Sequence, residues 1–378
     1  MIDKSESEMN ILPLYGHPKY CDQTELFISK YDLVEAVMLG DNRFSKASLK
    51  PIKERICRFC TKPYPETKFS NYSHLFPQSL GFQNLFSDFE CDECNHKFGA
   101  NESDLVNFIG ISRSIAALNQ EGLGPTFKGK LVSARSKIYA NENIVVLSVD
   151  ELPSDEISIQ ERKAGILRIP YTKQPYIPLK VYKALLKSAL SMISEEEIRN
   201  HYSNAIRFLR GEFIVTEGCI LSWFNMPIPV DHLPVAYLFK KRNSSDNLHT
   251  HIVSCYFQNH IINIPIPLHN LDMPTAKGNF QLLFTPPFFA THELENIEVL
   301  PGRKDMSSDK KVSDDIEVLT IAKDKSSNEK AVKYDPVTDT ITETNDEPES
   351  TRRIIFSKDG FSVNPKEFSA YIRREFGD

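Results

Sequence analysis

Two Cys-x-x-Cys pairs constrain the fold of this chain more than any other feature. Cys57 and Cys60 form the first pair, Cys91 and Cys94 form the second, and residues 61–90 lie between them. Four thiolates on two tight turns match the tetrahedral coordination of structural zinc, and redox use of either pair is the minor alternative. We therefore predict that Cys57, Cys60, Cys91 and Cys94 bind one structural Zn²⁺ and close the intervening chain into a loop. Such a site supplies roughly 10 kcal/mol of apparent folding free energy.

The composition fits a soluble protein of a reducing compartment. The chain has 378 residues, 40% of them hydrophobic, which is enough for two domains with cores. Its formal net charge of -6 argues against a globally basic nucleic-acid binder but allows a local basic patch. The N-terminus lacks a signal-peptide layout, and no apolar run reaches the roughly 18 residues that span a membrane. We expect a cytoplasmic protein with no membrane partner.

Changes of composition along the chain predict an α+β fold in five parts. The predicted parts are an N-terminal lead-in at 1–50, a zinc-stabilised domain at 51–130, a larger mixed domain with an antiparallel sheet at 131–302, a charged and mobile segment at 303–350, and an ordered C-terminal segment at 351–378. The type of element within the lead-in stays open, because its apolar residues fit both helical and strand spacing.

Apolar spacing predicts the elements of the larger domain. We expect helices at 102–120, 178–194 and 194–211, the last capped by Ser194 with Glu197 three residues on. We expect strands within 141–150 and 157–171, and an antiparallel sheet from 212–224, 233–242, 249–257, 260–268 and 279–289. In this sheet, His249 and His251 share one face of a strand, where a structural pair is favoured over a metal site.

The stretch "YSHLFPQSLGFQNL", residues 72–85, lies between the cysteine pairs. It supplies His-x-x-Pro, then Gly81 and Asn84, and the second pair follows in "CDECNHKFG" with Asn95 directly after Cys94. The ordered set resembles the HNH, or ββα-metal, endonuclease family, specifically its four-cysteine zinc-stabilised branch. The resemblance covers about residues 55–110. It implies a small ββα-metal domain and hydrolysis of phosphodiester bonds.

The resemblance also implies three roles at these positions. His74 matches the general base that takes a proton from the attacking water. Asn84 matches the residue that braces the loop and orients the histidine through the backbone. Asn95 matches the last motif position, a ligand of the catalytic divalent metal, Mg²⁺ or Mn²⁺. A neutral imidazole can accept a proton near pH 7, and an amide oxygen is a suitable ligand for a hard cation.

One position departs from the family pattern. Members often carry an acid or histidine directly before the base, as a second metal ligand, whereas this chain has Ser73. The acid could come from elsewhere, or the domain could have lost catalysis and kept only binding. His96 is not expected to be a ligand. The acids available near the motif are Asp88, Asp92, Glu102 and Asp104.

Basic residues around the first cysteine pair suit phosphate contacts, although a solvated charged face explains them equally well. They are Lys50, Lys53, Arg55, Arg58, Lys62, Lys68, Lys97 and Arg113. The predicted function is therefore a metal-dependent HNH endonuclease acting on DNA, with RNA as the second choice, in a setting such as bacterial antiviral defence. The alternatives are an inactive module that binds nucleic acid or a partner, and a nuclease effector switched on by a ligand or protein at the larger domain. Because one such site cuts one strand, a homodimer would supply the two cuts that a double-strand break needs.

Overall fold

A computed structural model describes most of the chain and divides it into two compact units. The described residues are 14–115, 126–128, 132–139, 142–149, 166–215, 218–226, 234–257, 259–272, 281–289, 299–312, 316–322, 332–335, 340–343 and 352–357. The first unit joins residues 1–105 to 177–310, and the second joins 106–176 to 311–378. This division by packing differs from the sequential boundaries expected above, which stay predictions.

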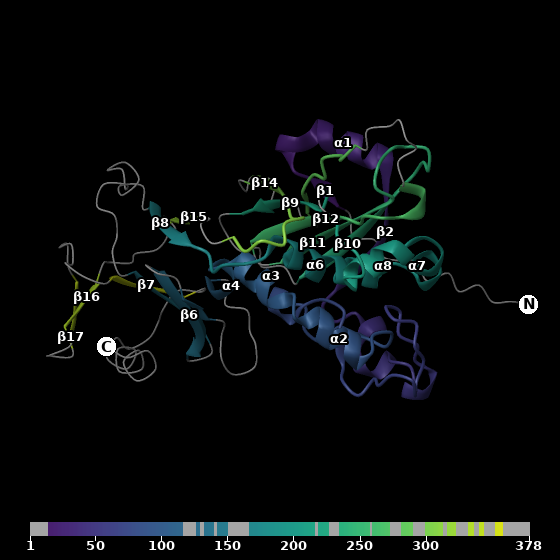
Figure 1. Ribbon diagram of the computed structural model, residues 1–378. Helices are drawn as coiled ribbons and strands as arrows, with labels where there is room; N and C mark the ends of the chain where they lie inside the picture. The colour runs from purple at the N-terminus through teal and green to yellow at the C-terminus, as the bar shows by residue number, and fades with distance from the viewer. Residues whose placement is uncertain are drawn as a thin grey trace, which may run out of the picture. The chain divides into compact units, whose positions relative to one another are not determined.

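An antiparallel six-stranded sheet forms the centre of the first unit (Figure 1). Its strands in spatial order are β14 (Leu300–Asp305), β9 (Ile220–Asn225), β12 (His260–Pro265), β11 (His251–Phe257), β10 (Val235–Lys241) and β2 (Tyr31–Met38). The expected α+β class and antiparallel sheet are confirmed. The expected fifth strand at 279–289 is wrong, because within the described residues 281–289 only β13 (Phe288–Phe289) forms, and it pairs with β1 (Tyr15–Gly16) outside the sheet.

Helices cover both faces of this sheet (Figure 1). Helix α1 (Cys21–Lys30) lies on one face, where Phe27 meets Phe239 of β10 edge-on with ring centroids 5.1 Å apart. Three helices lie on the other face: α6 (Pro178–Met192), α7 (Glu195–His201) and α8 (Ser203–Leu209). There, the Tyr182 hydroxyl donates to the Pro265 carbonyl of β12 at 3.0 Å. Alternate side chains of β10 and β11 therefore enter two different cores.

Local chemistry explains most of the helix ends. Pro178 opens α6 at a position where its missing N–H costs no hydrogen bond. The Ser194 side chain accepts from the Glu197 N–H, as the predicted cap requires. The single helix expected at 194–211 is wrong, because Tyr202 leaves helical geometry at ψ 17° and separates α7 from α8. The helix expected at 102–120 also breaks, at Gly110 with φ 68°, between α3 (Glu102–Ile109) and α4 (Ser112–Ile115).

The segment between the cysteine pairs folds as two short strands followed by a helix. Strand β3 (Ser73–His74) pairs with β4 (Phe86–Ser87), and α2 (Asp92–Gly99) follows. Short 3-10 helices connect the elements of the first unit: η1 (Pro18–Tyr20), η2 (Asn42–Phe44), η3 (Lys46–Ser48), η4 (Ile52–Glu54), η5 (Gln78–Leu80) and η6 (Asn270–Asp272). Gly81 ends η5 at φ 90°, a left-handed conformation that favours glycine. The expected ββα arrangement is confirmed.

The second unit is built from antiparallel strands. Its four-stranded sheet has the order β18 (Arg352–Ser357), β7 (Glu142–Val149), β6 (Val132–Tyr139), β5 (Thr126–Lys128), and its two-stranded pairs are β8 (Ile166–Thr172) with β15 (Ile316–Ala322) and β16 (Val332–Asp335) with β17 (Thr340–Glu343). The strands expected within 141–150 and 157–171 are present as β7 and β8. Residues 358–378 of the expected C-terminal segment lie outside the described residues. None of the described helices combines the length and apolarity needed to cross a bilayer.

Candidate nuclease site

The four cysteines of the two pairs come together in the first unit. One sulfur from each of Cys57, Cys60, Cys91 and Cys94 lies within 4.8 Å of the other three. The Cys60 and Cys91 sulfurs are 3.7 Å apart, close to the roughly 3.8 Å expected for two sulfurs that each lie about 2.3 Å from a tetrahedral zinc. The donor set and its spacing therefore fit structural zinc.

Main-chain contacts shape both turns that carry the sulfurs. The Cys57 N–H donates to the Lys62 carbonyl at 2.9 Å, and Thr61, at φ 62°, donates its N–H to the Cys57 carbonyl at 2.8 Å. Cys91 precedes α2 directly, and Cys94 lies in its first turn. A hydrogen bond shared with Cys94 lowers the pKa of Cys57 to about 5 and raises the pKa of Cys94. Without a cation, the Cys57 thiolate is therefore favoured at the expense of the Cys94 thiolate. A divalent cation would stabilise all four thiolates together.

His74 occupies the second position of strand β3. Its ring packs on Phe86 of β4 with centroids 4.9 Å apart, and its Nδ1 is buried without a hydrogen-bond partner among the described residues. Burial lowers the pKa of His74 to about 4, and the charges of Lys187 and Lys46 lower it further in the same direction. The imidazole is therefore neutral at pH 7, the state in which one ring nitrogen can accept a proton.

One cavity of about 430 Å³ lies beside His74. Asn95, in the middle of α2, and Glu102, the first residue of α3, also line this cavity. The full lining is His74, Gln78, Asn95, His96, Gly99, Ala100 and Glu102. The fold thus brings two of the three motif residues to one cavity, together with a carboxylate.

Ser73 and Asn84 are outside this cavity lining. Ser73 is 1% exposed, and its hydroxyl donates inward to the Glu90 carbonyl at 3.3 Å. Asn84 is exposed at φ 60°, in the left-handed region that asparagine tolerates. Within the described part of the chain, no hydrogen bond links its amide to the His74 loop. Its conformation favours a turn residue, and its role as a brace stays a prediction.

Of the four acids near the motif, three bind main-chain groups. Asp88 accepts from the Lys50 N–H at 3.1 Å, Asp92 accepts from the Ser70 and Asn71 N–H groups, and Asp104 accepts from the Ile177 N–H at 2.6 Å. Glu102 instead lines the cavity. Burial raises the pKa of Glu102, and the charge of Lys187 opposes that rise. Glu102 is therefore the acid that can meet a ligand in this cavity.

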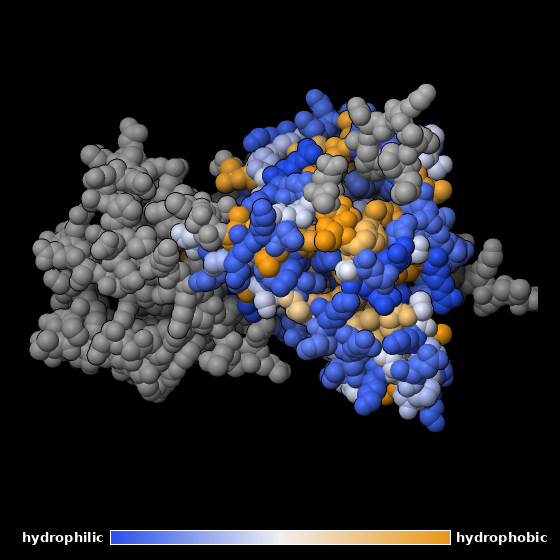
Figure 2. All heavy atoms as spheres, viewed as in Figure 1, coloured by the Kyte–Doolittle hydropathy of each residue, from blue (hydrophilic) through white to orange (hydrophobic). Residues whose placement is uncertain are grey.

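The basic residues near the motif separate into two groups. Arg55 is buried and donates to the Lys50 carbonyl, and Arg58 is enclosed by main-chain carbonyls, so these two are structural. The second group is exposed and consists of Lys53, Lys62, Lys68 and Lys97. Figure 2 shows a mainly hydrophilic surface around α2. Sequence reasoning missed Lys46, which lies 4.7 Å from the Tyr72 ring centroid and is close enough to His74 to lower its pKa.

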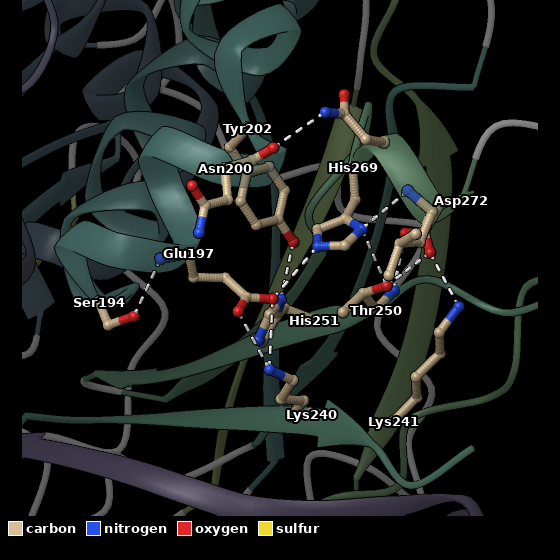
Figure 3. A network of polar contacts seen from close by, with 12 residues as sticks. Ser194, Glu197, Asn200, Tyr202, Lys240, Lys241, Thr250, His251, His269 and Asp272 are labelled. Carbon is tan, nitrogen blue, oxygen red and sulfur yellow. Dashed lines mark hydrogen bonds and ion pairs between the residues drawn. The ribbon is translucent and has the colours of Figure 1, made fainter. Parts of the chain in front are cut away.

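A second cluster of candidate metal ligands lies between α7 and the sheet (Figure 3). Glu197, His251 and His269 each offer one ligand atom, and these atoms lie within 4.8 Å of one another. His249, which the sequence paired with His251, is not part of this cluster. Burial lowers the pKa of His251 to about 3 and also lowers the pKa of His269, so both rings are neutral.

Hydrogen bonds explain why these three side chains lie close together. The Leu271 N–H donates to His269 Nδ1 at 3.1 Å, which places the ring proton on Nε2, 3.2 Å from Glu197 Oε1. The Lys240 ammonium also contacts the Glu197 carboxylate at 3.2 Å, and the Tyr202 hydroxyl meets His251 Nδ1 at 2.8 Å. The Glu197 carboxylate thus already accepts from the His269 N–H and from the Lys240 ammonium. This favours a structural network over a metal site.

Comparison with known proteins identifies the segment that carries the first site. Residues 57–105 match the family model described as HNH endonuclease. No curated protein and no solved structure matches the chain. The chain therefore contains an HNH endonuclease domain, and its zinc-type cysteines, His74, Asn95 and Glu102 all lie within the matched residues.

Proposed function

We propose that the protein is an HNH endonuclease that hydrolyses phosphodiester bonds in DNA. The observation that supports this most is the shared cavity, which holds a histidine with an unpartnered nitrogen, an amide and a carboxylate. A cavity of about 430 Å³ can admit a phosphate and its bound water. RNA remains the second choice of substrate, because exposed lysines contact the phosphates of either nucleic acid.

His74 acts as the general base in this proposal. Its imidazole accepts a proton from the water that attacks phosphorus, and general-base catalysis of this kind is worth roughly 10²–10⁴-fold in rate. The pKa of about 4 keeps the ring neutral before substrate binds. A bound phosphate offsets the charge of Lys46, so the basicity of His74 rises when the substrate is in place.

Asn95 and Glu102 would hold the catalytic Mg²⁺ or Mn²⁺. The fit rests on the donors, because the amide oxygen and the carboxylate that line this cavity are hard oxygen ligands. When bound, this metal supplies electrostatic stabilisation of the phosphate and of the leaving oxygen. Glu102 thus replaces the acid that many family members carry at the position of Ser73.

The zinc at the four cysteines has a different role. With four sulfur donors it has no open position, so it stabilises the turns around the catalytic loop and takes no part in the reaction. A domain that binds nucleic acid without cutting is the second candidate function, and the buried Ser73 favours it. Bacterial defence, a ligand or protein activator, and a homodimer for double-strand cuts stay predictions.

Cleavage of supercoiled plasmid tests the proposal. The wild type should nick the plasmid with Mg²⁺ or Mn²⁺, and His74→Ala should lose at least about 100-fold in rate while it keeps zinc and fold. His201→Ala, on α7 and outside the cavity lining, is the matched control and should cut like the wild type. Equal cutting by His74→Ala would refute the assignment, and tight binding of DNA by an inactive wild type would support the second candidate.

A further inference from the structure

Helix α6 carries a lysine in an otherwise buried position. Thirteen of its residues are buried, and they include Lys187, whose side chain is 6% exposed. A buried ammonium costs several kcal/mol unless hydrogen bonds and an opposite charge compensate for it. The groups that contact the Lys187 ammonium therefore indicate the structural role of this part of α6.

Both partners of Lys187 lie in the nuclease module, residues 57–105. Its ammonium contacts the Glu90 carboxylate at 2.8 Å, where the Glu90 side chain is fully buried just before Cys91. The same ammonium donates to the main-chain carbonyl of His74. One side chain thus links α6 to the catalytic strand and to the chain entering the second cysteine pair.

His74 has few other main-chain anchors. Strands β3 and β4 are two residues long each, and beyond them the Leu75 N–H donates to the Leu85 carbonyl at 2.9 Å. The direction of the His74 ring follows from the main chain that bears it, and Phe86 supports only the ring. Fixing the His74 carbonyl therefore fixes the direction in which the His74 side chain meets the cavity.

We propose that Lys187 is a positioning residue, which holds the main chain of His74 in the orientation that catalysis requires. This role rests on the proposed nuclease function. It replaces the bracing role expected of Asn84, whose exposed amide makes no hydrogen bond to the His74 loop among the described residues. Lys187 follows His74 by 113 residues, so the sheet-covering helix completes a site whose motif lies elsewhere in the sequence.

The test compares cleavage by the full-length wild type with that of Lys187→Met/Glu90→Gln. The double variant removes both buried charges, so neither is left unpaired. We expect kcat to fall about 10- to 100-fold, because a displacement of about 1 Å at a catalytic group can cost 100-fold. KM for the plasmid should change less than about threefold, since Lys187 is too buried to meet the substrate. Zinc content and the urea midpoint report the fold.

Three comparisons make the result specific. Lys183→Met, one turn earlier on α6 with its ammonium over Phe208, should leave kcat unchanged. Lys187→Gln/Glu90→Gln should recover part of kcat, because its amide can still donate to the His74 carbonyl. The loss in the Lys187→Met double variant should exceed the loss in Asn84→Gly, which keeps the left-handed conformation without the amide.

Each outcome bears on the proposal. Unchanged kcat in a folded, zinc-loaded Lys187→Met/Glu90→Gln overturns the positioning role and leaves the nuclease function intact. A larger loss in Asn84→Gly overturns it as well. If the methionine variant loses zinc, Lys187→Leu/Glu90→Leu, which also lacks a donor to the His74 carbonyl, carries the test, and unchanged kcat in that folded, zinc-loaded variant overturns the role. A wild type that cuts with neither metal overturns the proposed function and the role together.

Discussion

Arg58 lies inside the first cysteine turn and ties it to the end of helix α6. Its guanidinium donates to the carbonyls of Leu190, Ser191 and Ile193 at 3.0–3.2 Å and to the Glu195 carboxylate at 3.0 Å. It also lies 3.8 Å from the Phe89 ring centroid. The last carbonyls of a helix have no partner within the helix, so Arg58 satisfies groups that water would otherwise reach.

Arg58→Met keeps much of the volume and removes these bonds. The Arg58 side chain is 8% exposed, so its contacts are shielded from solvent, whereas Glu195 is 42% exposed and can be hydrated after the change. A hydrogen bond to a charged group contributes about 1.5–3 kcal/mol, and Arg58→Met removes those to three main-chain carbonyls as well as the pair with Glu195. We expect Arg58→Met to lower the free energy of unfolding by about 3–4 kcal/mol.

Arg199→Met is the matched control, because Arg199 binds the same Glu195 carboxylate at 2.9 Å. Its side chain is 65% exposed, and an exposed pair of this spacing contributes about 0.3–0.5 kcal/mol. Urea unfolding with saturating zinc measures both variants against the wild type. The reasoning is refuted if Arg58→Met costs less than about 1 kcal/mol, or no more than Arg199→Met.

Three further results are expected. Glu102→Gln should raise the Mg²⁺ concentration for half-maximal plasmid cleavage at least about 10-fold, because it removes a charged oxygen ligand. The control Glu93→Gln, on the exposed side of α2, should leave this concentration unchanged. Equal metal dependence of Glu102→Gln and the wild type would exclude Glu102 as a ligand. Elemental analysis should find one zinc per chain, unchanged in His269→Ala, since the Glu197 network is held by hydrogen bonds; a second zinc that His269→Ala removes would show the opposite. His251 has a folded pKa of about 3 and an unfolded pKa near 6.5, so the unfolded chain binds a proton first as pH falls, and stability is lost between about pH 6.5 and 3. From pH 7 to 5 this amounts to about 2 kcal/mol, and urea unfolding of His251→Gln should show a smaller loss than the wild type; an equal loss would assign the effect to other groups.

Motifs within short segments of the sequence predicted the cysteine cluster and the placement of His74 and Asn95. Two Cys-x-x-Cys turns place their sulfurs locally, and these sulfurs do form a cluster. The motif also placed His74 and Asn95 on one ββα unit, where they share a cavity. The choice of Glu102 among four nearby acids could not be made from the sequence, because it depends on which carboxylates accept main-chain N–H groups.

Long-range packing decided what the sequence could not. Lys180, Lys183 and Lys187 recur at helical spacing, a pattern typical of a solvent-facing stripe. Lys187 is nevertheless buried, because the nuclease module covers that end of α6. Strand β2 was left open between helix and strand for a similar reason, since its pairing with β10 joins distant parts of the chain.

The separation between His74 and Lys187 has a consequence during protein synthesis. The nuclease motif leaves the ribosome first, and Lys187 follows 113 residues later. At about 5–20 residues per second, this interval lasts roughly 6–23 s. Under the proposed role of Lys187, the nascent chain lacks through that time the ammonium that orients His74, so its cleavage rate should be about 10- to 100-fold below that of the complete protein.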